Sequence, residues 1–152
     1  MASWGELVDA EPELADHVRR CFGIRKHSTL ATLRRDGSPR ISGTEVEFGD
    51  DGELYLGMLP GSMKALDLRR DPRLALHCPT DDAPESDPAS WLGDAKVAGR
   101  AVEVSSPQDG EGAHRFRVDL TEVTVTTVGT PADHLVIRSW HPGRGLERRD
   151  RR

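Results

Sequence analysis

Apolar residues recur at helical spacing near the start of the chain. The stripe consists of Leu14, Val18, Cys21 and Phe22, which stand at i, i+4, i+7 and i+8. Pro12 is tolerated in a first helical turn, and Gly23 is suited to follow a helix. This pattern predicts one helix over residues 12–26.

After residue 27 the apolar residues alternate with a period of two, which is typical of half-buried strands. Turn signals such as Asp36-Gly37 separate the short runs. We expect Gly99 to mark a bulge, and the sixth run to bend or split near residues 119–121. The predicted strands cover residues 28–34, 39–48, 53–58, 73–78, 94–104, 113–128 and 134–140.

A second helix is predicted over residues 62–70, between the third and fourth strands. Ser62 is a typical N-cap residue. Arg69 and Arg70 suit the negative end of the helix dipole. Asp71-Pro72 then ends the helix, because the residue before a proline avoids helical geometry.

Three further segments lack a regular pattern. Residues 79–90 are rich in Pro, Asp and Ser, and residues 105–112 are polar, so both are expected to be surface loops. Residues 140–145 contain Pro and Gly and predict a turn, after which the Arg-rich tail over 143–152 is expected to fray. Many short strands with frequent turns indicate an antiparallel barrel or sandwich.

The composition is that of a folded globular chain. A length of 152 residues suits a single domain over 1–152, with a helical segment over 1–26. The 36% hydrophobic residues and 15 Gly together reach the range of globular proteins. A mean hydropathy of -0.58 and the lack of a long apolar run exclude a membrane-spanning helix. Two Cys exclude a disulfide scaffold, and no secretory signal is recognised, so we expect a cytoplasmic protein with no membrane partner.

The charge is unevenly distributed along the chain. The net charge is -5, but residues 138–152 hold six Arg against Glu147 and Asp150, which gives +4 there and -9 elsewhere. An acidic body with few aromatic residues argues against a nucleic-acid partner. The Arg-rich end is either a solvated terminus or a contact to an anion or to a partner subunit.

The most informative local pattern is Gly61-Ser62-x-Lys64 at the start of the second predicted helix. The first turn of a helix has unpaired N–H groups and a partial positive charge, so a Lys there is unfavourable unless an anion is bound. The Ser62 hydroxyl, the N–H groups and the Lys64 ammonium together suit a phosphate. The alternative is that Ser62 only caps the helix and Lys64 points into water.

Three stretches in sequence order resemble the pyridoxamine 5'-phosphate oxidase-like, flavin-binding split-barrel superfamily. They are HSTLATLRRDGSPRISGTEVEF, GELYLGM and GSMKALDLRRDPRLALHC. The resemblance implies a mainly β, six-stranded antiparallel split barrel of Greek-key type with a few flanking helices. It also implies a homodimer with FMN or the deazaflavin F420 in a groove between the subunits, acting on a small-molecule substrate.

The resemblance assigns cofactor-binding roles to particular residues. Ser62 and Lys64, with their neighbours Gly61 and Met63, would hold the cofactor phosphate. Met58 and Leu59 would flank its chain or ring. The strand residues expected along the ring system are Ser42, Gly43, Thr44 and Glu45. Gly43 suits a position beside a planar ring because it has no side chain to collide with it.

The chain departs from true pyridoxamine phosphate oxidases at several positions. Ser42 stands where those enzymes have a phosphate-binding Arg, and Glu47 stands where they have a Lys. Their C-terminal Arg-x-His motif is missing, and the nearest residues are Arg138 and His141. Vitamin B6 oxidation is therefore not expected, and the chain looks more like small members that use F420 or FMN on other substrates.

Other candidate chemistry is weaker. The six His residues show no metal-binding spacing, so no metal site is expected. Cys21 is expected in the core, Trp91 packs or stacks near a cofactor in the partner subunit, and Arg144 either reaches an anion or is solvated. No residue is assigned as catalytic, because a bound flavin or deazaflavin would supply the chemistry. Thr44, Glu45 or Tyr55 could tune the protonation of a bound ring.

Three functions remain open at this point. The first is an FMN- or F420-dependent oxidoreductase that passes a hydride to a small organic acceptor. The second is a non-catalytic carrier or sensor that holds a flavin or haem in the same barrel. The third is a structural or partner-binding barrel without a cofactor.

Overall fold

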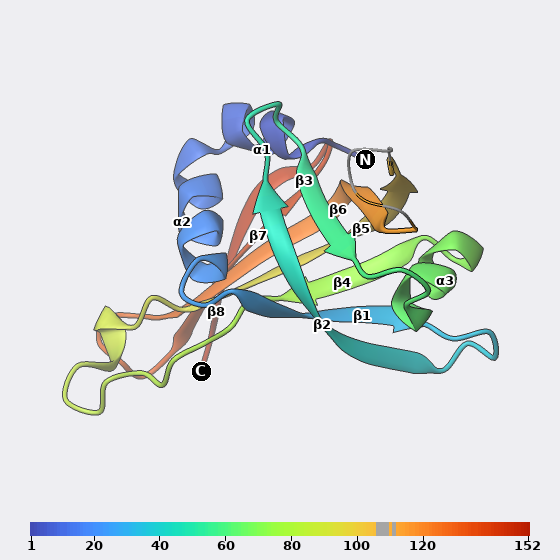
Figure 1. Cartoon of the computed structure of the whole chain (residues 1–152). Helices are drawn as coiled ribbons and strands as arrows, with labels where there is room; N and C mark the ends of the chain where they lie inside the picture. Colours follow the sequence, from blue (N-terminus) through green and yellow to red (C-terminus); the bar gives the residue numbers. More distant parts are fainter. Residues whose placement is uncertain (106–109, 111) are drawn as a thin grey trace.

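The computed structural model describes residues 1–105, 110 and 112–152 (Figure 1). The helices are α1 (Trp4–Ala10), α2 (Pro12–Phe22), α3 (Met63–Arg70) and the short 3-10 helix η1 (Pro88–Ser90). The strands are β1 (His27–Leu33), β2 (Pro39–Phe48), β3 (Leu54–Met58), β4 (Arg73–His77), β5 (Asp94–Glu103), β6 (His114–Val128), β7 (Leu135–His141) and β8 (Gly145–Arg151). The loop predicted over 105–112 lies mostly outside the described residues.

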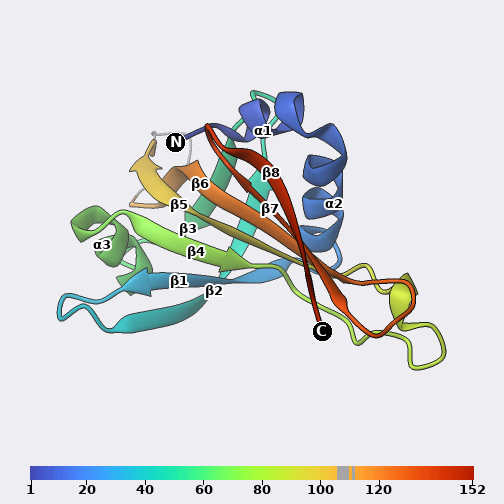
Figure 2. The ribbon, with the colours of Figure 1, turned by 180° about the vertical axis from the view of Figure 1, so that it is seen from behind.

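Six strands form a closed antiparallel barrel, as predicted. The sheet order is β3-β2-β1-β4-β5-β6, and β3 also pairs with β6, which closes the barrel. Because β4 returns to lie beside β1, the first four strands form a Greek key. Strands β7 and β8 continue the sheet beyond β6 as two additional strands (Figures 1 and 2).

The core lies inside the barrel and under α1 and α2, which pack against β5 and β6 at one end. Trp4 and Leu7 of α1 and Val18 of α2 are fully or almost fully buried. The Trp4 ring lies 4.6 Å from the Phe48 ring, centroid to centroid, so α1 packs on the end of β2. Burial of each large apolar side chain of this kind stabilises the fold by roughly 1.5–3 kcal/mol.

Helix α1 lies within the helical segment expected over 1–26, but a separate helix before residue 12 was not predicted. Helix α1 has a capping box in which the Ser3 hydroxyl accepts from the Glu6 N–H and the Glu6 carboxylate accepts from the Ser3 N–H. The Ser-x-x-Glu spacing is a recognised helix start and was the signal available. The predicted helix over 12–26 is correct in kind but ends at Phe22, with Gly23 as its C-cap.

The prediction of a frayed Arg-rich tail over 143–152 is wrong, because residues 145–151 form β8. This strand pairs in antiparallel register with β7, from His141 opposite Gly145 to Leu135 opposite Arg151. Gly143 and Gly145 take positive φ angles of 81° and 79°, which allow the tight connection between the two strands. The charged side chains of β8 suit an edge strand, since charge discourages pairing with further chains.

The bulge predicted at Gly99 is confirmed. The β5–β6 register shifts between Ala98, which faces Glu122, and Gly99, which faces Leu120. A Cβ on Gly99 would lie 2.2 Å from the Asp119 carbonyl oxygen, so only glycine fits there. The register shift skips Thr121, where the sixth run was expected to bend or split, and β6 is one strand from His114 to Val128.

No helix in the described part of the chain combines the length and the apolar character that crossing a membrane requires.

Candidate functional site

A groove of about 960 Å³ lies on the outer surface of the barrel, over β2 and β3, beside the start of α3. Cross-strand pairing builds its floor, because His27, Glu45, Gly57 and Arg115 are consecutive partners across β1, β2, β3 and β6. The groove is lined by His27, Gly43, Thr44, Glu45, Val46, Glu47, Gly57, Met58, Leu59, Lys64, Ala113, His114 and Arg115.

Six of the ten expected cofactor-binding residues line this groove, and four do not. Those that line it are Gly43, Thr44, Glu45, Met58, Leu59 and Lys64. Ser42 is the cross-strand partner of Leu30. It belongs to the alternate residues of β2 that are less exposed and point into the barrel. Gly61 and Ser62 lie just before α3, and Met63 lines a different groove on the far side of that helix.

The Lys64 side chain does not extend into bulk water. Its Nζ donates a hydrogen bond of 2.6 Å to the Gly43 carbonyl oxygen, which joins the first turn of α3 to β2. Burial lowers the pKa of Lys64 below its ordinary value. An ammonium has three donors, so this bond leaves two for other acceptors in the groove.

Ser62 has the position of an N-cap residue but not its hydrogen bond. Its backbone is extended, with φ of -62° and ψ of 141°, and its side chain makes no capping bond. The Ser62 Oγ is buried and has no partner among the described residues. A buried hydroxyl without a partner costs free energy, so this atom is suited to receive an external hydrogen-bonding group.

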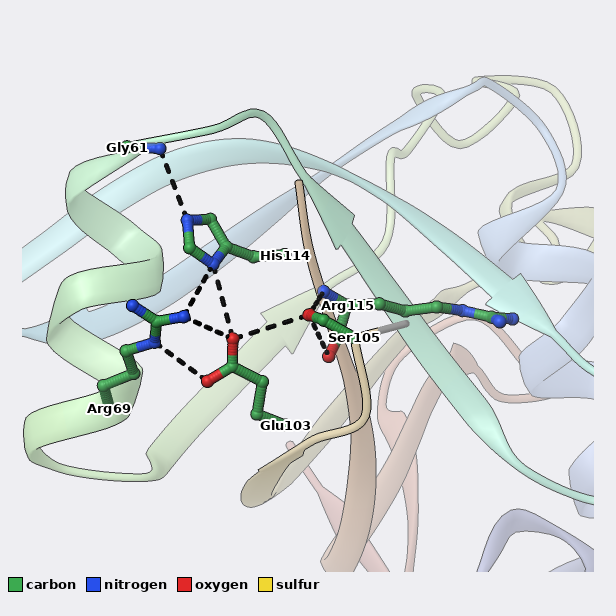
Figure 3. A network of polar contacts seen from close by, with 6 residues as sticks. All are labelled: Gly61, Arg69, Glu103, Ser105, His114 and Arg115. Atoms are coloured by element: carbon green, nitrogen blue, oxygen red, sulfur yellow. Dashed lines mark hydrogen bonds and ion pairs between the residues drawn. The ribbon is translucent and has the colours of Figure 1, made fainter. Parts of the chain in front are cut away.

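A polar network holds the turn before α3 in place (Figure 3). The His114 Nε2 lies 3.3 Å from the Gly61 N, and its Nδ1 lies 3.4 Å from a Glu103 oxygen and 3.2 Å from an Arg69 nitrogen. Arg69 donates twice to the same carboxylate, at 2.8 and 2.7 Å. The Arg69 guanidinium, helped by His114, lowers the pKa of Glu103 to about 2. The network ties α3 to β5 and β6.

A buried carboxylate fixes the other side of α3. Asp67 is 1% exposed and accepts hydrogen bonds from Thr32 at 2.8 Å, Arg40 at 2.7 Å and Arg70 at 3.0 Å. Burial acts to raise the pKa of Asp67, but the hydrogen bonds from Arg40, Thr32 and Arg70 outweigh it and lower the pKa. These bonds hold α3 against the β1–β2 hairpin, so the position of Lys64 is well defined.

The opposite end of the groove carries charges of both signs. The Arg115 guanidinium lies 3.9 Å above the Tyr55 ring centroid and 3.3 Å from a Glu47 oxygen. Glu45 lies 3.4 Å from the Lys26 Nζ and 3.7 Å from the His27 Nε2. The carboxylates at positions 45 and 47 therefore face cations and not a ligand phosphate.

The floor between the two ends is open. A Cβ built on Gly43 or on Gly57 would meet no atom within 4 Å. Two side-chain-free positions on neighbouring strands leave a smooth surface on which a planar ring can lie. The Lys64 ammonium, which lines the groove at the start of α3, and this floor fit a ligand with a phosphate and a flat ring system.

Sequence reasoning missed the contributions of Gly57, Glu103, His114 and Arg115. They reach the site only because β3 pairs with β6 and because β5 ends beside α3, as Met58 facing His114 and Gly57 facing Arg115 illustrate. No local sequence motif predicts the pairing of β3 with β6 that closes the barrel.

Trp91 and Arg144 lie away from the groove beside α3. Both line a separate groove of about 680 Å³ over β5 to β8. The Trp91 indole N–H donates to the Asp81 carbonyl oxygen at 2.8 Å, so it anchors the β4–β5 loop of its own chain. Cys21 is buried in the core, as expected, and Cys78 is buried as well.

Comparison with known proteins supports the fold. No protein-family model and no curated protein matches the chain. Among solved structures, a pyridoxamine 5'-phosphate oxidase-related, FMN-binding protein from Nostoc punctiforme is similar at 12% identity and a TM-score of 0.65, over 93% of this chain and 96% of that one. PhzG from Burkholderia lata, in complex with tetrahydrophenazine-1-carboxylic acid, is similar at 11% identity and a TM-score of 0.64, over 97% and 92%.

A haem-binding protein from Mycobacterium smegmatis is also similar, at 16% identity and a TM-score of 0.56, over 93% of this chain and 88% of that one. These identities are low, and what the chains share is the arrangement of strands described above. The chain therefore has the same split-barrel fold as the pyridoxamine 5'-phosphate oxidase-related structure.

Proposed function

We propose that this protein is an oxidoreductase that binds FMN or F420 in the groove beside α3 and passes a hydride to a small organic acceptor. The observation that carries the proposal is the start of α3, where the half-buried Lys64 ammonium lines the groove and the buried Ser62 hydroxyl, two residues earlier, has no partner among the described residues. A helix start with these two groups offers a phosphate the donors and positive charge it needs.

The chain's own residues would bind and orient the cofactor. Ser62 and Lys64 would hold the phosphate, and Gly43 and Gly57 would let the ring lie against β2 and β3. When bound, a flavin or deazaflavin supplies the hydride chemistry, so no protein side chain has to act as nucleophile or acid. Glu45 lies on the floor between His27 and Gly57, its cross-strand partners, and is suited to orient a polar ring edge.

We infer that a second copy of the chain covers the groove. Large apolar side chains are exposed on both sides of α3: Leu59 lines this groove, and Met63 and Leu66 line the groove on the other side of the helix. Exposed apolar side chains of this size are typical of a surface that meets another protein. Closure by a partner would exclude water from the ring and complete the pocket for the acceptor.

A cytoplasmic location agrees with this function. Cys21 and Cys78 are buried and form no disulfide in the structure, which is compatible with a reducing compartment.

One observation favours a second candidate, a carrier or sensor without turnover. His27 lines the groove with an exposed imidazole, which is an axial ligand that haem iron accepts. The haem-binding protein from Mycobacterium smegmatis, which has a similar fold, also supports this alternative.

A spectroscopic titration separates the candidates. The purified chain is titrated separately with FMN, F420 and haem, and the visible spectrum is recorded. The proposal predicts saturable binding of FMN or F420, followed by oxidation of the reduced cofactor when quinone or nitro compounds are added. A Soret band that disappears in His27→Ala, with no flavin or deazaflavin binding, supports the carrier. Failure of all three to bind contradicts both candidates.

A further inference from the structure

A second groove, of about 880 Å³, lies on the other side of α3, between that helix and the tip of the β1–β2 hairpin. It is strongly basic, because five arginines surround two aspartates. It is lined by Arg34, Arg35, Asp36, Arg40, Met63, Leu66, Asp67, Arg69 and Arg70. We refer to this set as the arginine groove.

The charges of the arginine groove are only partly neutralised from within the chain. Arg40 and Arg70 share the buried Asp67 carboxylate, and Arg69 is paired with Glu103 outside the groove. Arg34 and Arg35 are exposed at the start of the hairpin turn, and neither has an ion-pair partner among the described residues. The groove therefore attracts an anionic partner that is not part of the same surface.

The complementary feature is the acidic loop over residues 79–90. It contains Asp81, Asp82, Glu85 and Asp87 and no Lys or Arg. Asp81 is paired with Arg25, and its carbonyl oxygen accepts from Trp91, so the base of the loop is tied to the barrel. In the described part of the chain, the exposed carboxylates of Asp82, Glu85 and Asp87 have no ion-pair partner.

The acidic loop and the arginine groove lie at opposite ends of the molecule. In Figure 1 the yellow-green β4–β5 loop projects on one side, and α3 and the β1–β2 hairpin lie on the other. Figure 2, seen from behind, shows the same separation. The loop therefore cannot reach the groove of its own chain.

We propose that the acidic loop of one copy of this chain docks into the arginine groove of a second copy, twice in a two-fold symmetric dimer. In a two-fold symmetric dimer a contact from the loop of one copy to the groove of the other is made twice, because both subunits contribute the same patch to the interface. The exposed side chains of Met63 (55%) and Leu66 (41%) in the groove add apolar contact. The proposal concerns the dimer contact and does not require a cofactor to be bound.

Charge reversal on one side of this contact tests it directly. The groove variant carries Arg34→Glu and Arg35→Glu, and the loop variant carries Asp82→Lys and Glu85→Lys. All four side chains are exposed, so each variant is expected to fold, and circular dichroism checks this. Mass by light scattering is measured over a dilution series. The wild type is expected at twice the mass of the chain, and each variant alone is expected to dissociate at concentrations roughly 100-fold higher or more.

The mixture of the two variants gives the sharper result. The reversed loop of one variant matches the reversed groove of the other, and the two unchanged partners match as well. An equimolar mixture is therefore expected to restore the dimer, and so is the chain that carries all four substitutions. The control variant Arg144→Glu with Arg149→Glu changes the charge by the same amount on β7–β8 and is expected to leave the dimer unchanged.

Three outcomes would overturn the proposal: a monomeric wild type at all concentrations, reversal variants that dimerise like the wild type, or a mixture that stays monomeric. The same samples are titrated with FMN and F420. Absence of cofactor binding with an intact charge-swap result rejects the proposed function and keeps the loop contact. The reverse pattern, in which cofactor binds but the charge swap fails, rejects the loop contact alone.

Discussion

The Lys64 Nζ lies 2.6 Å from the Gly43 carbonyl oxygen, so a helix and a strand that are far apart in the sequence meet at one end of the groove. A lysine in the first turn of a helix is repelled by the positive end of the helix dipole. Here the ammonium is turned back over β2 and is half-buried, and the Ser62 hydroxyl two residues earlier is buried without a partner among the described residues. The unfavourable contact between a lysine and the helix N-terminus is relieved when an anion binds there, so this arrangement favours a bound anion.

Two glycine substitutions should distinguish a glycine of the groove floor, which the fold does not require, from a glycine that the fold does require. For Gly43→Ala we expect the free energy of unfolding to change by less than ~1 kcal/mol, because the new methyl meets no atom within 4 Å. For Gly99→Ala we expect a loss of about 1–3 kcal/mol, because the methyl would collide with the Asp119 carbonyl oxygen 2.2 Å away. Urea denaturation measures both. If a ring rests on β2, Gly43→Ala also weakens cofactor binding, and unchanged affinity would argue against the ring position.

The Asp67→Ala substitution should destabilise the protein by roughly 3–5 kcal/mol, because it leaves two arginines without their buried carboxylate. The loss is seen as a lower urea midpoint at unchanged slope. Asp16→Ala is the control, since its pair with Arg20 is exposed and is worth about 0.3–0.5 kcal/mol. Equal effects of the two substitutions would show that Asp67 does not anchor α3.

Glu103 should make the stability pH-dependent in the acid range. Its pKa is lowered from 4.5 to about 2, first by the Arg69 hydrogen bonds, so between these values the unfolded chain binds more protons than the folded one. The stabilisation is therefore complete above pH 4.5 and is lost as the pH falls toward 2. Unfolding free energies at several pH values should show a smaller acid loss for Glu103→Gln than for the wild type. Identical profiles would contradict the network in Figure 3.

His17 should act in the same direction at higher pH. Its Nε2 donates to the Leu92 carbonyl oxygen at 2.6 Å, and its Nδ1 accepts from Arg138 at 2.8 Å, so the folded state needs the neutral ring. Burial lowers the pKa of His17 below 6.5, and the stabilisation is present above that pH and is lost as the pH falls. His17→Gln should remove part of the stability difference between pH 7 and pH 5. A wild type that is equally stable at both pH values would rule out this contribution.

The alternation of apolar and polar residues was sufficient to predict the strands of the barrel. Turn residues between the runs indicated where each strand ends. Gly37, with a positive φ of 86°, turns the first hairpin at the position that Asp36-Gly37 indicated. Two elements escaped prediction. Helix α1 is only seven residues long, and β8 carries a charged sequence whose strand structure comes from backbone pairing with β7.

The candidate site could be predicted only where it is local in sequence. Ser62 and Lys64 were singled out because they stand together at one predicted helix start, and of the two Lys64 lines the groove. His114 and Arg115 reach the groove through pairing of β3 with β6, and Glu103 reaches α3 through the course of β5. Such long-range pairings leave no signature in any short motif.

The most direct test of the central claim compares cofactors with and without their phosphate. FMN and riboflavin, and F420 and its deazaflavin core lacking the phosphate-linked tail, are titrated into the wild type, Lys64→Ala and the control Lys96→Ala, in which an exposed lysine on β5 is removed. The wild type and Lys96→Ala should bind one phosphate-bearing cofactor at least about tenfold more tightly than its phosphate-free counterpart, and Lys64→Ala should lose most of that preference. An unchanged preference in Lys64→Ala would contradict a phosphate site at the start of α3.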